Sequence, residues 1–320
     1  MFYHAIRTIM KQITNTVMMI KPTAFRYNEQ TAVNNYYQKK LNNLTSSEVQ
    51  NNALCEFVDF VNKLREVGVN VIEIQDTTSL DTPDSIFPNN WVSFHQDGRV
   101  VIYPMYAKNR RGERRQDIID LLIDKYNFSV ENILDLSQME NNGLFLEGTG
   151  SMVLDRVNRL CYAALSPRTH KEAILKFCQA FHYKAICFTA NQDIGNDRSL
   201  IYHTNVMMCI ADQYVIICLD SIDNHKERQL LINSFNSTGK EIIEISEKQK
   251  ERFAGNMLQI IGDRKYLIMS DSAYESLTQD QIKKIDRYNP IISSNLDTIE
   301  GCGGGSARCM IAEVFLPKNI

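Results

Sequence analysis

Long apolar runs and an excess of charge of one sign are both missing from this sequence. Its 320 residues carry 35 Lys and Arg against 38 Asp and Glu, a formal net charge of −3. We therefore expect no nucleic-acid partner, because phosphate backbones attract proteins through a basic surface. No apolar run approaches the ~18–20 residues that a membrane span needs, so no membrane partner is expected either. Arg7 and Lys11 interrupt the N-terminal segment, and no secretory signal is expected there.

Motifs for metals and nucleotides are missing as well. The eight cysteines contain no CxxC pair, and no Cys/His spacing is typical of a zinc site. Several of them stand in apolar segments as small hydrophobic residues. This usage fits a reducing compartment and predicts a cytoplasmic protein. No GxGxxG motif follows a strand and opens a helix. We therefore expect neither a metal nor a cofactor.

The composition is that of a globular protein with room for a full core. Hydrophobic residues make up 44% and charged residues 23%, as in ordinary soluble domains. A chain of this length buries roughly three quarters of its unfolded surface. No pattern is visible at the start of the chain. Residues 1–16 are predicted to be an N-terminal extension, and residues 17–320 a single domain.

A repeated unit runs along the chain: two strands joined by a tight turn, then a helix, then one more strand. The clearest turn contains Asp97-Gly98, because this pair accepts the positive φ of a hairpin. The hairpins recur after roughly 50–60 residues, which is typical of a repeat architecture. Their strands are predicted at 91–95 with 100–105, 151–154 with 159–165, 206–210 with 214–219, and 257–261 with 266–269.

Helices are predicted between the hairpins, at 52–66, 113–126, 171–181, 224–235 and 279–287. Single strands are predicted at 70–74, 184–190, 241–246 and 290–293. The period gives about five ββαβ units, with a C-terminal strand at 308–316 closed by an N-terminal strand at 17–20. We therefore expect an α/β propeller around a central site. A doubly wound parallel sheet is the weaker alternative, because tight hairpins recur where that fold needs helical crossovers.

Polar residues stand beside apolar strands in four segments: FPNNW (87–91), LEGTG (146–150), YHTN (202–205) and GGGSARC (303–309). Equivalent strand ends of a propeller converge on one axis, which would bring Cys309, His203 and Glu147 together. A thiol needs a nearby base, an imidazole transfers protons near neutral pH, and a carboxylate orients the imidazole. Taken singly, Cys309 could be a buried thiol, His203 a hydrogen-bonded histidine and Glu147 a solvated acid.

Together these segments resemble the guanidino-group-modifying, or pentein, superfamily, and within it the citrulline-utilisation hydrolases, an amidinotransferase-like family. The resemblance covers nearly the whole chain and implies a five-bladed α/β propeller of ββαβ units. It implies that Cys309 attacks the central carbon of a guanidine or ureido group, that His203 moves protons and that Glu147 orients His203. It also implies that Phe87 lies against the planar group and that Arg168 binds the substrate carboxylate.

Two positions depart from the arginine deiminases, which carry aspartates where this sequence has Asn90 and Asn205. A guanidinium is cationic and only donates, whereas a ureido group is neutral and has a carbonyl acceptor. Asparagines favour the neutral group, because a buried guanidinium without a counter-charge is costly. The sequence therefore predicts a cysteine hydrolase acting on C–N bonds, which converts citrulline to ornithine, carbon dioxide and ammonia.

Other readings stay open. The chain could be an arginine or methylarginine deiminase or dimethylaminohydrolase, an amidinotransferase, or a binding protein with the same fold. Arg168 argues against agmatine, which has no carboxylate. The asparagines could line the pocket for another purpose. The expected partner is a small amino acid with a ureido or guanidino group, and a homodimer stays open.

Overall fold

Five three-stranded sheets and one two-stranded hairpin contain the strands of residues 10–319, which the computed structural model describes. In each three-stranded sheet the middle strand pairs antiparallel with one neighbour and parallel with the other. The sheets are β17 (Ala312–Glu313), β1 (Thr16–Lys21) and β2 (Asn70–Gln75); β3 (Val92–Phe94), β4 (Arg99–Ile102) and β5 (Asn132–Asp135); β6 (Val153–Asp155), β7 (Leu160–Ala164) and β8 (Lys184–Phe188); β11 (Met208–Ile210), β12 (Tyr214–Ile217) and β13 (Glu241–Glu244); and β14 (Leu258–Ile261), β15 (Lys265–Ser270) and β16 (Ile291–Ser294). The hairpin is β9 (Asn191–Ile194) with β10 (Asp197–Leu200).

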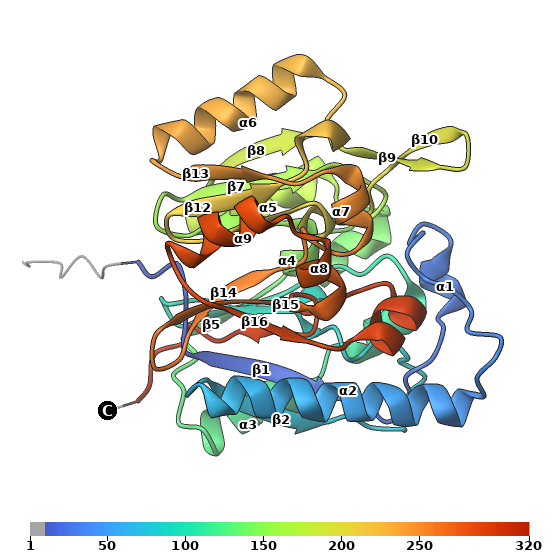
Figure 1. The fold of residues 1–320 in the computed structure, drawn as a ribbon. Helices are drawn as coiled ribbons and strands as arrows, with labels where there is room; N and C mark the ends of the chain where they lie inside the picture. The colour runs from blue at the N-terminus through green and yellow to red at the C-terminus, as the bar shows by residue number, and fades with distance from the viewer. Residues whose placement is uncertain (1–9, 320) are drawn as a thin grey trace, which may run out of the picture.

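The longer helices pack on the outer sides of the sheets (Figure 1). α2 runs along β1 and β2 at the bottom of the view, and α6 lies over β13 at the top. The α-helices are α1 (Glu29–Ala32), α2 (Ser46–Glu66), α3 (Gln116–Asp124), α4 (Gly148–Ser151), α5 (Lys171–Phe181), α6 (His225–Ser237), α7 (Glu247–Glu251), α8 (Asp271–Ser276) and α9 (Gln279–Asp286). Short 3₁₀ turns cover 88–90, 108–113, 137–142, 204–206 and 219–221, and a π-helical turn covers 299–303.

Helix α2 forms for local reasons that can be read from its residues. Thr45 caps it by accepting from the backbone N–H of Glu48, whose carboxylate accepts in return from the backbone of Thr45. One face is buried at helical spacing, through Val49, Ala53, Phe57, Phe60, Val61 and Leu64. The helix was predicted to begin at residue 52. It begins at Ser46, because this capping box precedes the apolar stripe.

The two ends of the chain meet in one sheet. β17 pairs antiparallel with β1, with Val17 opposite Glu313, as the repeat predicts. The C-terminal strand predicted at 308–316 is wrong in length. Residues 307–310 form a turn, in which Arg308 donates to the backbone oxygen of Ile311 at 2.8 Å, so only Ala312–Glu313 is a strand. No strand pairing among the described residues joins the separate sheets into a closed barrel.

All four predicted hairpins form, so the mixed α/β fold of small sheets is confirmed and a doubly wound sheet is excluded. The prediction missed β5 and the β9–β10 hairpin. Residues 1–9 of the predicted extension lie outside the described residues. Beyond them, Gln12 donates to the backbone oxygen of Leu154 at 3.0 Å and Thr14 to that of Val314 at 2.9 Å, so this part lies against the sheets.

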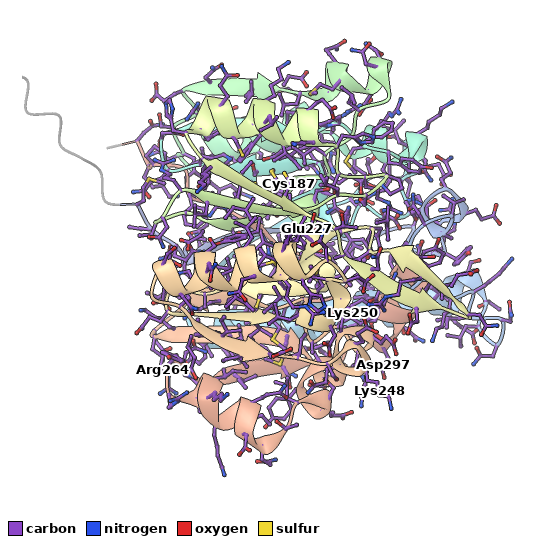
Figure 2. All side chains as sticks on the ribbon, turned by 90° about the horizontal axis from the view of Figure 1, so that it is seen from above. Cys187, Glu227, Lys248, Lys250, Arg264 and Asp297 are labelled. Atoms are coloured by element: carbon purple, nitrogen blue, oxygen red, sulfur yellow. The ribbon has the colours of Figure 1, made fainter. Side chains whose placement is uncertain are left out.

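Side chains fill the space between the ribbons (Figure 2), and Lys250 of α7 is buried among them. Its Nζ donates to Tyr37 Oη and to Gln192 Oε1, each at 3.2 Å, and burial lowers its pKa. These bonds connect α7 with the segment around Tyr37. Of the helices in residues 10–319, none combines the length and the apolar character needed to cross a bilayer.

Candidate active site

The predicted site residues gather around one small cavity of about 10 Å³, which is lined by buried side chains. A volume of this size holds about one water molecule. Five of them line it directly: Phe87, Asn90, Arg168, His203 and Cys309. The other two lie just behind, with Glu147 bonded to His203 and Asn205 bonded to Cys309. Each residue comes from a turn or a short helix between strands, so strand ends do converge here as the repeat predicts.

Glu147 and His203 form a buried pair. Glu147 precedes α4, His203 precedes the 3₁₀ turn at 204–206, and Glu147 Oε2 lies 2.8 Å from His203 Nε2. The carboxylate only accepts, so Nε2 carries the proton and Nδ1 is left free. Burial, helped by the positive charges of Arg168 and Arg110, lowers the pKa of His203 to about 4 although Glu147 opposes the shift. The imidazole is therefore neutral at rest.

The carboxyl group of Glu147 is kept ionised. Burial would raise its pKa, but Arg168, His203 and Arg110 together hold it below the ordinary value. Arg168 Nη1 lies 3.4 Å and Arg110 Nη1 3.9 Å from its Oε2, while the backbone N–H of Tyr106 donates to Oε1 at 3.0 Å. An anion is thus fixed against the imidazole, where it orients the ring and stabilises its protonated form.

A glycine lets the asparagine and the histidine approach each other. A Cβ atom added at Gly150 of α4 would lie 2.3 Å from Asn90 Nδ2 and 2.8 Å from His203 Nδ1. Any side chain there would push both groups away. The same contacts show that Asn90 Nδ2 and His203 Nδ1 face one place from two elements.

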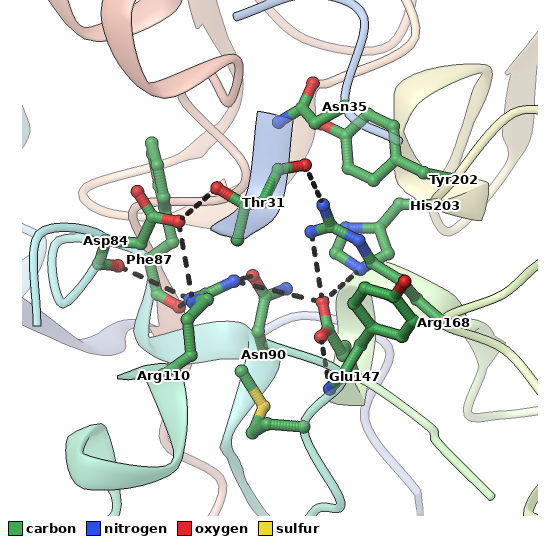
Figure 3. Close-up of polar contacts among 12 residues, drawn as sticks. Thr31, Asn35, Asp84, Phe87, Asn90, Arg110, Glu147, Arg168, Tyr202 and His203 are labelled. Atoms are coloured by element: carbon green, nitrogen blue, oxygen red, sulfur yellow. Dashed lines mark hydrogen bonds and ion pairs between the residues drawn. The ribbon is translucent and has the colours of Figure 1, made fainter. Parts of the chain in front are cut away.

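Arg110 determines which way Asn90 points. Arg110 is 2% exposed, and its Nη1 donates to Asn90 Oδ1 at 2.8 Å (Figure 3). A guanidinium has no acceptor, so the oxygen of Asn90 must face it. Asn90 Nδ2 is then a buried donor without a partner in the protein. Arg110 is itself held by Glu113 at 2.8 Å. Sequence reasoning missed Arg110 because no motif includes it.

Asp84 is a second residue that the sequence analysis missed. It lines the cavity, is 2% exposed, and accepts from Asn28 Nδ2 at 2.8 Å and Thr31 Oγ1 at 3.0 Å through one oxygen. Its other oxygen has no hydrogen-bond partner. The asparagines at positions 90 and 205 therefore do not leave the cavity without a carboxylate. The carboxylate comes from another segment than the two asparagines.

Cys309 lies in the turn that follows the glycine run. It is 3% exposed, and two amide nitrogens point at its sulfur: Asn256 Nδ2 at 3.1 Å and Asn205 Nδ2 at 3.4 Å. Asn205 Oδ1 has no partner. Asn256 was also missed, because it stands alone between α7 and β14 with no motif around it.

Residues 28–38, which include α1 and which we call the covering segment, close the cavity from one side. Asn35 Nδ2 donates to the backbone oxygens of Gly303 and Gly304, each at 3.3 Å. Gln38 Nε2 donates to that of Cys302 at 3.3 Å. The segment and the glycine run are thus joined over the cavity.

Arg168, predicted to bind a carboxylate, holds the covering segment in this structure. Its Nη2 donates to the backbone oxygen of Thr31 at 2.7 Å (Figure 3). Its Nε donates to Asn34 Oδ1 at 2.8 Å. Its guanidinium also lies over the ring of Tyr202, 4.9 Å from the centroid. Arg168 therefore lies in the cavity wall with Nε and Nη2 facing the covering segment and Nη1 facing Glu147.

Metal ligands were searched for in the same way. Within residues 10–319, no group of three or more His, Cys, Asp or Glu side chains is placed to hold a metal ion.

Comparisons with known proteins identify the family of the chain. The family model described as N,N dimethylarginine dimethylhydrolase, eukaryotic, matches residues 21–316. This family is part of the superfamily that the motifs resemble; membership of the citrulline-utilisation family is not confirmed. A comparison with curated protein sequences gives no match.

Solved structures share the fold. ArgZ, an arginine dihydrolase from the ornithine–ammonia cycle in Cyanobacteria, is 18% identical with a TM-score of 0.72, over 95% of this chain and 41% of that chain. Its N-terminal domain alone is 17% identical with a TM-score of 0.72, over 93% of this chain and 97% of that one. A dimethylarginine dimethylaminohydrolase is 14% identical with a TM-score of 0.61, over 94% and 99%. At these identities the likeness shows the fold alone, and the chain spans less than half of the full ArgZ chain.

Proposed function

The chain belongs to the N,N-dimethylarginine dimethylhydrolase family, and from that premise we propose that it hydrolyses the guanidino group of arginine or of an N-methylated arginine. The observation that carries the proposal is the buried Glu147–His203 pair beside the same small cavity as Cys309. These are a base, its orienting anion and a thiol, which thiol-dependent hydrolysis needs.

The reaction proceeds in two steps. Cys309 Sγ bonds to the guanidino carbon, and the thiol proton passes to His203 Nδ1 and on to the departing nitrogen, so that the C–N bond breaks and ammonia or a methylamine leaves. Water then attacks the same carbon and gives a proton to His203. The C–S bond breaks, and that proton returns to the sulfur. The second proton of the water leaves as the carbonyl group of citrulline forms, so a guanidinium substrate gives citrulline and the ammonium form of the departed amine. A neutral resting imidazole is the form that can accept the first proton.

The cavity walls offer partners for a guanidinium. Asp84 lines the cavity and supplies a carboxylate with one oxygen that has no hydrogen-bond partner. Asn205, which lies behind the cavity and bonds to Cys309, has Oδ1 as an acceptor without a partner. Phe87 is a flat apolar wall for the planar group. Arg168 is the cation available to the substrate carboxylate, once it exchanges its bonds to the covering segment for that group.

Citrulline is the second candidate, and one observation favours it. Arg110 occupies Asn90 Oδ1, so only the donor Nδ2 is left for the substrate. A donor suits the carbonyl oxygen of a ureido group and cannot bind a guanidinium N–H. Attack of Cys309 on that carbonyl, with loss of ammonia, would leave an N-substituted carbamoyl thioester. Water would then cleave this thioester to ornithine and carbon dioxide and return the thiol of Cys309.

We also propose that residues 17–320 form one catalytic domain and that its five sheets are the blades of a propeller. The support is the strand order, which repeats in every sheet. The family match across 21–316 agrees with a single domain.

Separate incubations with arginine, monomethylarginine, asymmetric dimethylarginine and citrulline test the proposal, with product amino acids and amines measured together. We expect citrulline and ammonia, methylamine or dimethylamine from guanidino substrates, lost in Cys309→Ala and retained in Cys55→Ala, whose cysteine is exposed. Ornithine from citrulline with no guanidino turnover would replace the first candidate by the second. Turnover that persists in Cys309→Ala would overturn both.

A further inference from the structure

We propose that Asn256 is a catalytic residue that holds the sulfur of Cys309 in position and stabilises it as the thiolate. This inference rests on the proposed function, in which Cys309 is the nucleophile. Neither the sequence motifs nor the family resemblance points to Asn256. The residue lies 53 positions before Cys309 and is 0% exposed.

The orientation of the Asn256 amide is determined by its neighbours. The backbone N–H groups of Arg308 and Cys309 donate to Oδ1 at 3.1 Å and 3.3 Å. An N–H group needs an acceptor, so the oxygen must face these two and the nitrogen must face the other way. Nδ2 then points at Cys309 Sγ at 3.1 Å and at the backbone oxygen of Asn205 at 3.0 Å.

Both ends of the Asn256 amide therefore bond to the turn that contains Cys309. One end holds the backbone at Arg308 and Cys309, and the other holds the sulfur. The amide has two donors and one oxygen with two lone pairs, and all of them are used. No polar atom of Asn256 is left for a substrate, so its contacts serve the cysteine turn and the neighbouring Asn205.

Asn205 differs in this respect. Its Nδ2 also donates to Cys309 Sγ, at the longer distance of 3.4 Å, but its Oδ1 is free. Asn205 therefore has an acceptor left for a substrate, whereas every polar atom of Asn256 is already bonded to the protein. Asn256 therefore holds the nucleophile, and Asn205 can also bind the reacting group.

The backbone presents Asn256 through a tight turn. Phe253 has a φ of 60°, and the Asn256 N–H donates back to the backbone oxygen of Phe253 at 2.8 Å. A Cβ atom at Gly255 would lie 2.3 Å from the backbone oxygen of Val206, so this turn presses directly on the segment that carries Asn205. The left-handed conformation of a bulky residue is uncommon and needs support from the surrounding structure. Here it brings a donor to the sulfur.

The amide donors stabilise the Cys309 thiolate because little water can reach it. An anion in a cavity with space for about one water molecule is solvated mainly by protein donors. A hydrogen bond that is made to the charged form favours that form. Two amide donors on the sulfur therefore replace the water that a thiolate would lose when the covering segment is closed.

The test is the pH profile of Cys309 alkylation by iodoacetamide, followed on the Cys309 peptide by mass spectrometry, without substrate. Asn256→Asp keeps the size of the side chain and an acceptor for the two backbone N–H groups, but it replaces the donor by a carboxylate oxygen. We expect the midpoint of the profile to move to higher pH and the rate at pH 7 to fall about 10- to 100-fold, as for loss of a hydrogen bond to a charged group. Asn256→Ala should shift the midpoint in the same direction.

The control variant is Asn289→Ala, another buried asparagine, which bonds to Tyr214 and Gln259 away from the cavity. It should lower the melting temperature without moving the midpoint. If a folded Asn256→Asp or Asn256→Ala keeps the wild-type midpoint, or if wild-type Cys309 titrates like the exposed Cys55, the proposal is contradicted. Since alkylation needs no substrate, a shifted midpoint in a protein that turns over none of the four amino acids would support this inference while refuting the proposed function.

Discussion

In this site, the hydrogen bonds that a side chain already makes decide which of its atoms can bind a substrate. The residue type alone does not. Asn90 has its oxygen on Arg110 and its nitrogen free, whereas Asn205 has its nitrogen on Cys309 and its oxygen free. The same residue type therefore offers a donor at one position and an acceptor at the other. Asn90 lines the cavity together with Asp84, whose Oδ1 has no partner, and Asn205 lies behind it against Cys309. The site therefore offers one unpaired donor and two unpaired acceptors.

The Glu147 carboxylate is expected to be needed for the rate of the reaction. Glu147→Gln removes the anion that orients His203 and stabilises its protonated form, so kcat/KM should fall about 10³–10⁴-fold. Glu66→Gln, an exposed glutamate on α2, serves as the control. Activity within a factor of two of wild type in a folded Glu147→Gln would show that the imidazole needs no anion.

His203 gives a pH dependence with a definite sign. Its pKa of about 4 means that the imidazole accepts protons at any higher pH. The acidic limb of kcat/KM should therefore lie near pH 4, well below the ordinary histidine range, with no loss between pH 7 and pH 5.5. Rates and circular dichroism are to be recorded together at each pH. A folded enzyme that loses activity with a midpoint near 6.5 would contradict the neutral resting state.

At the scale of elements, short sequence patterns correctly predicted the turns and helices that neighbouring residues determine. The Asp97-Gly98 turn indicated the β3–β4 hairpin, and helix α5 has the bounds predicted for it, because it ends where His182 adopts a left-handed φ of 56°. The extended reading of 308–316 failed because contacts of Arg308 with Ile311 and Glu313, absent from any local pattern, turn the chain. Asp84, Arg110 and Asn256 were missed for a different reason. The residues that they contact at the site, Asn28, Asn90 and Cys309, lie in other segments of the chain.

The covering segment should control access to Cys309. Asn35→Ala removes both bonds to the glycine run, so the segment should open more often. We expect faster alkylation of Cys309 at constant pH with an unchanged pH midpoint, together with a higher KM. Asn236→Ala, a substitution on the distant helix α6, should change neither. Slower alkylation in Asn35→Ala would mean that the segment does not close the cavity.

At the scale of the whole molecule, buried ion pairs support the sheet in which the two ends of the chain pair. Glu313 of β17 accepts from Arg308 at 2.8 Å, next to the nucleophile turn, and from Arg156 at 3.4 Å, in the β6–β7 turn. All three side chains are buried. One carboxylate therefore pairs with two cations, one from the turn before β17 and one from the turn between β6 and β7.

Glu313→Gln would leave both arginines without a counter-charge. We expect the free energy of unfolding to fall by about 3–5 kcal/mol, as for a broken buried ion pair. Asp117→Asn, which breaks the exposed pair with Arg115, should cost under about 1 kcal/mol. Urea unfolding of the two variants makes the comparison. Equal losses would mean that this charge cluster does not stabilise the closure.

The most direct test of the central claim is mass spectrometry of the protein quenched in acid during turnover of asymmetric dimethylarginine and, separately, of arginine. Both substrates should leave the same adduct, on Cys309, because the dimethylamine or the ammonia has already departed when the C–S bond persists. Glu147→Gln should accumulate less of it. An adduct on another cysteine, or turnover with Cys309 unmodified throughout, would contradict attack by this thiol on the guanidino carbon.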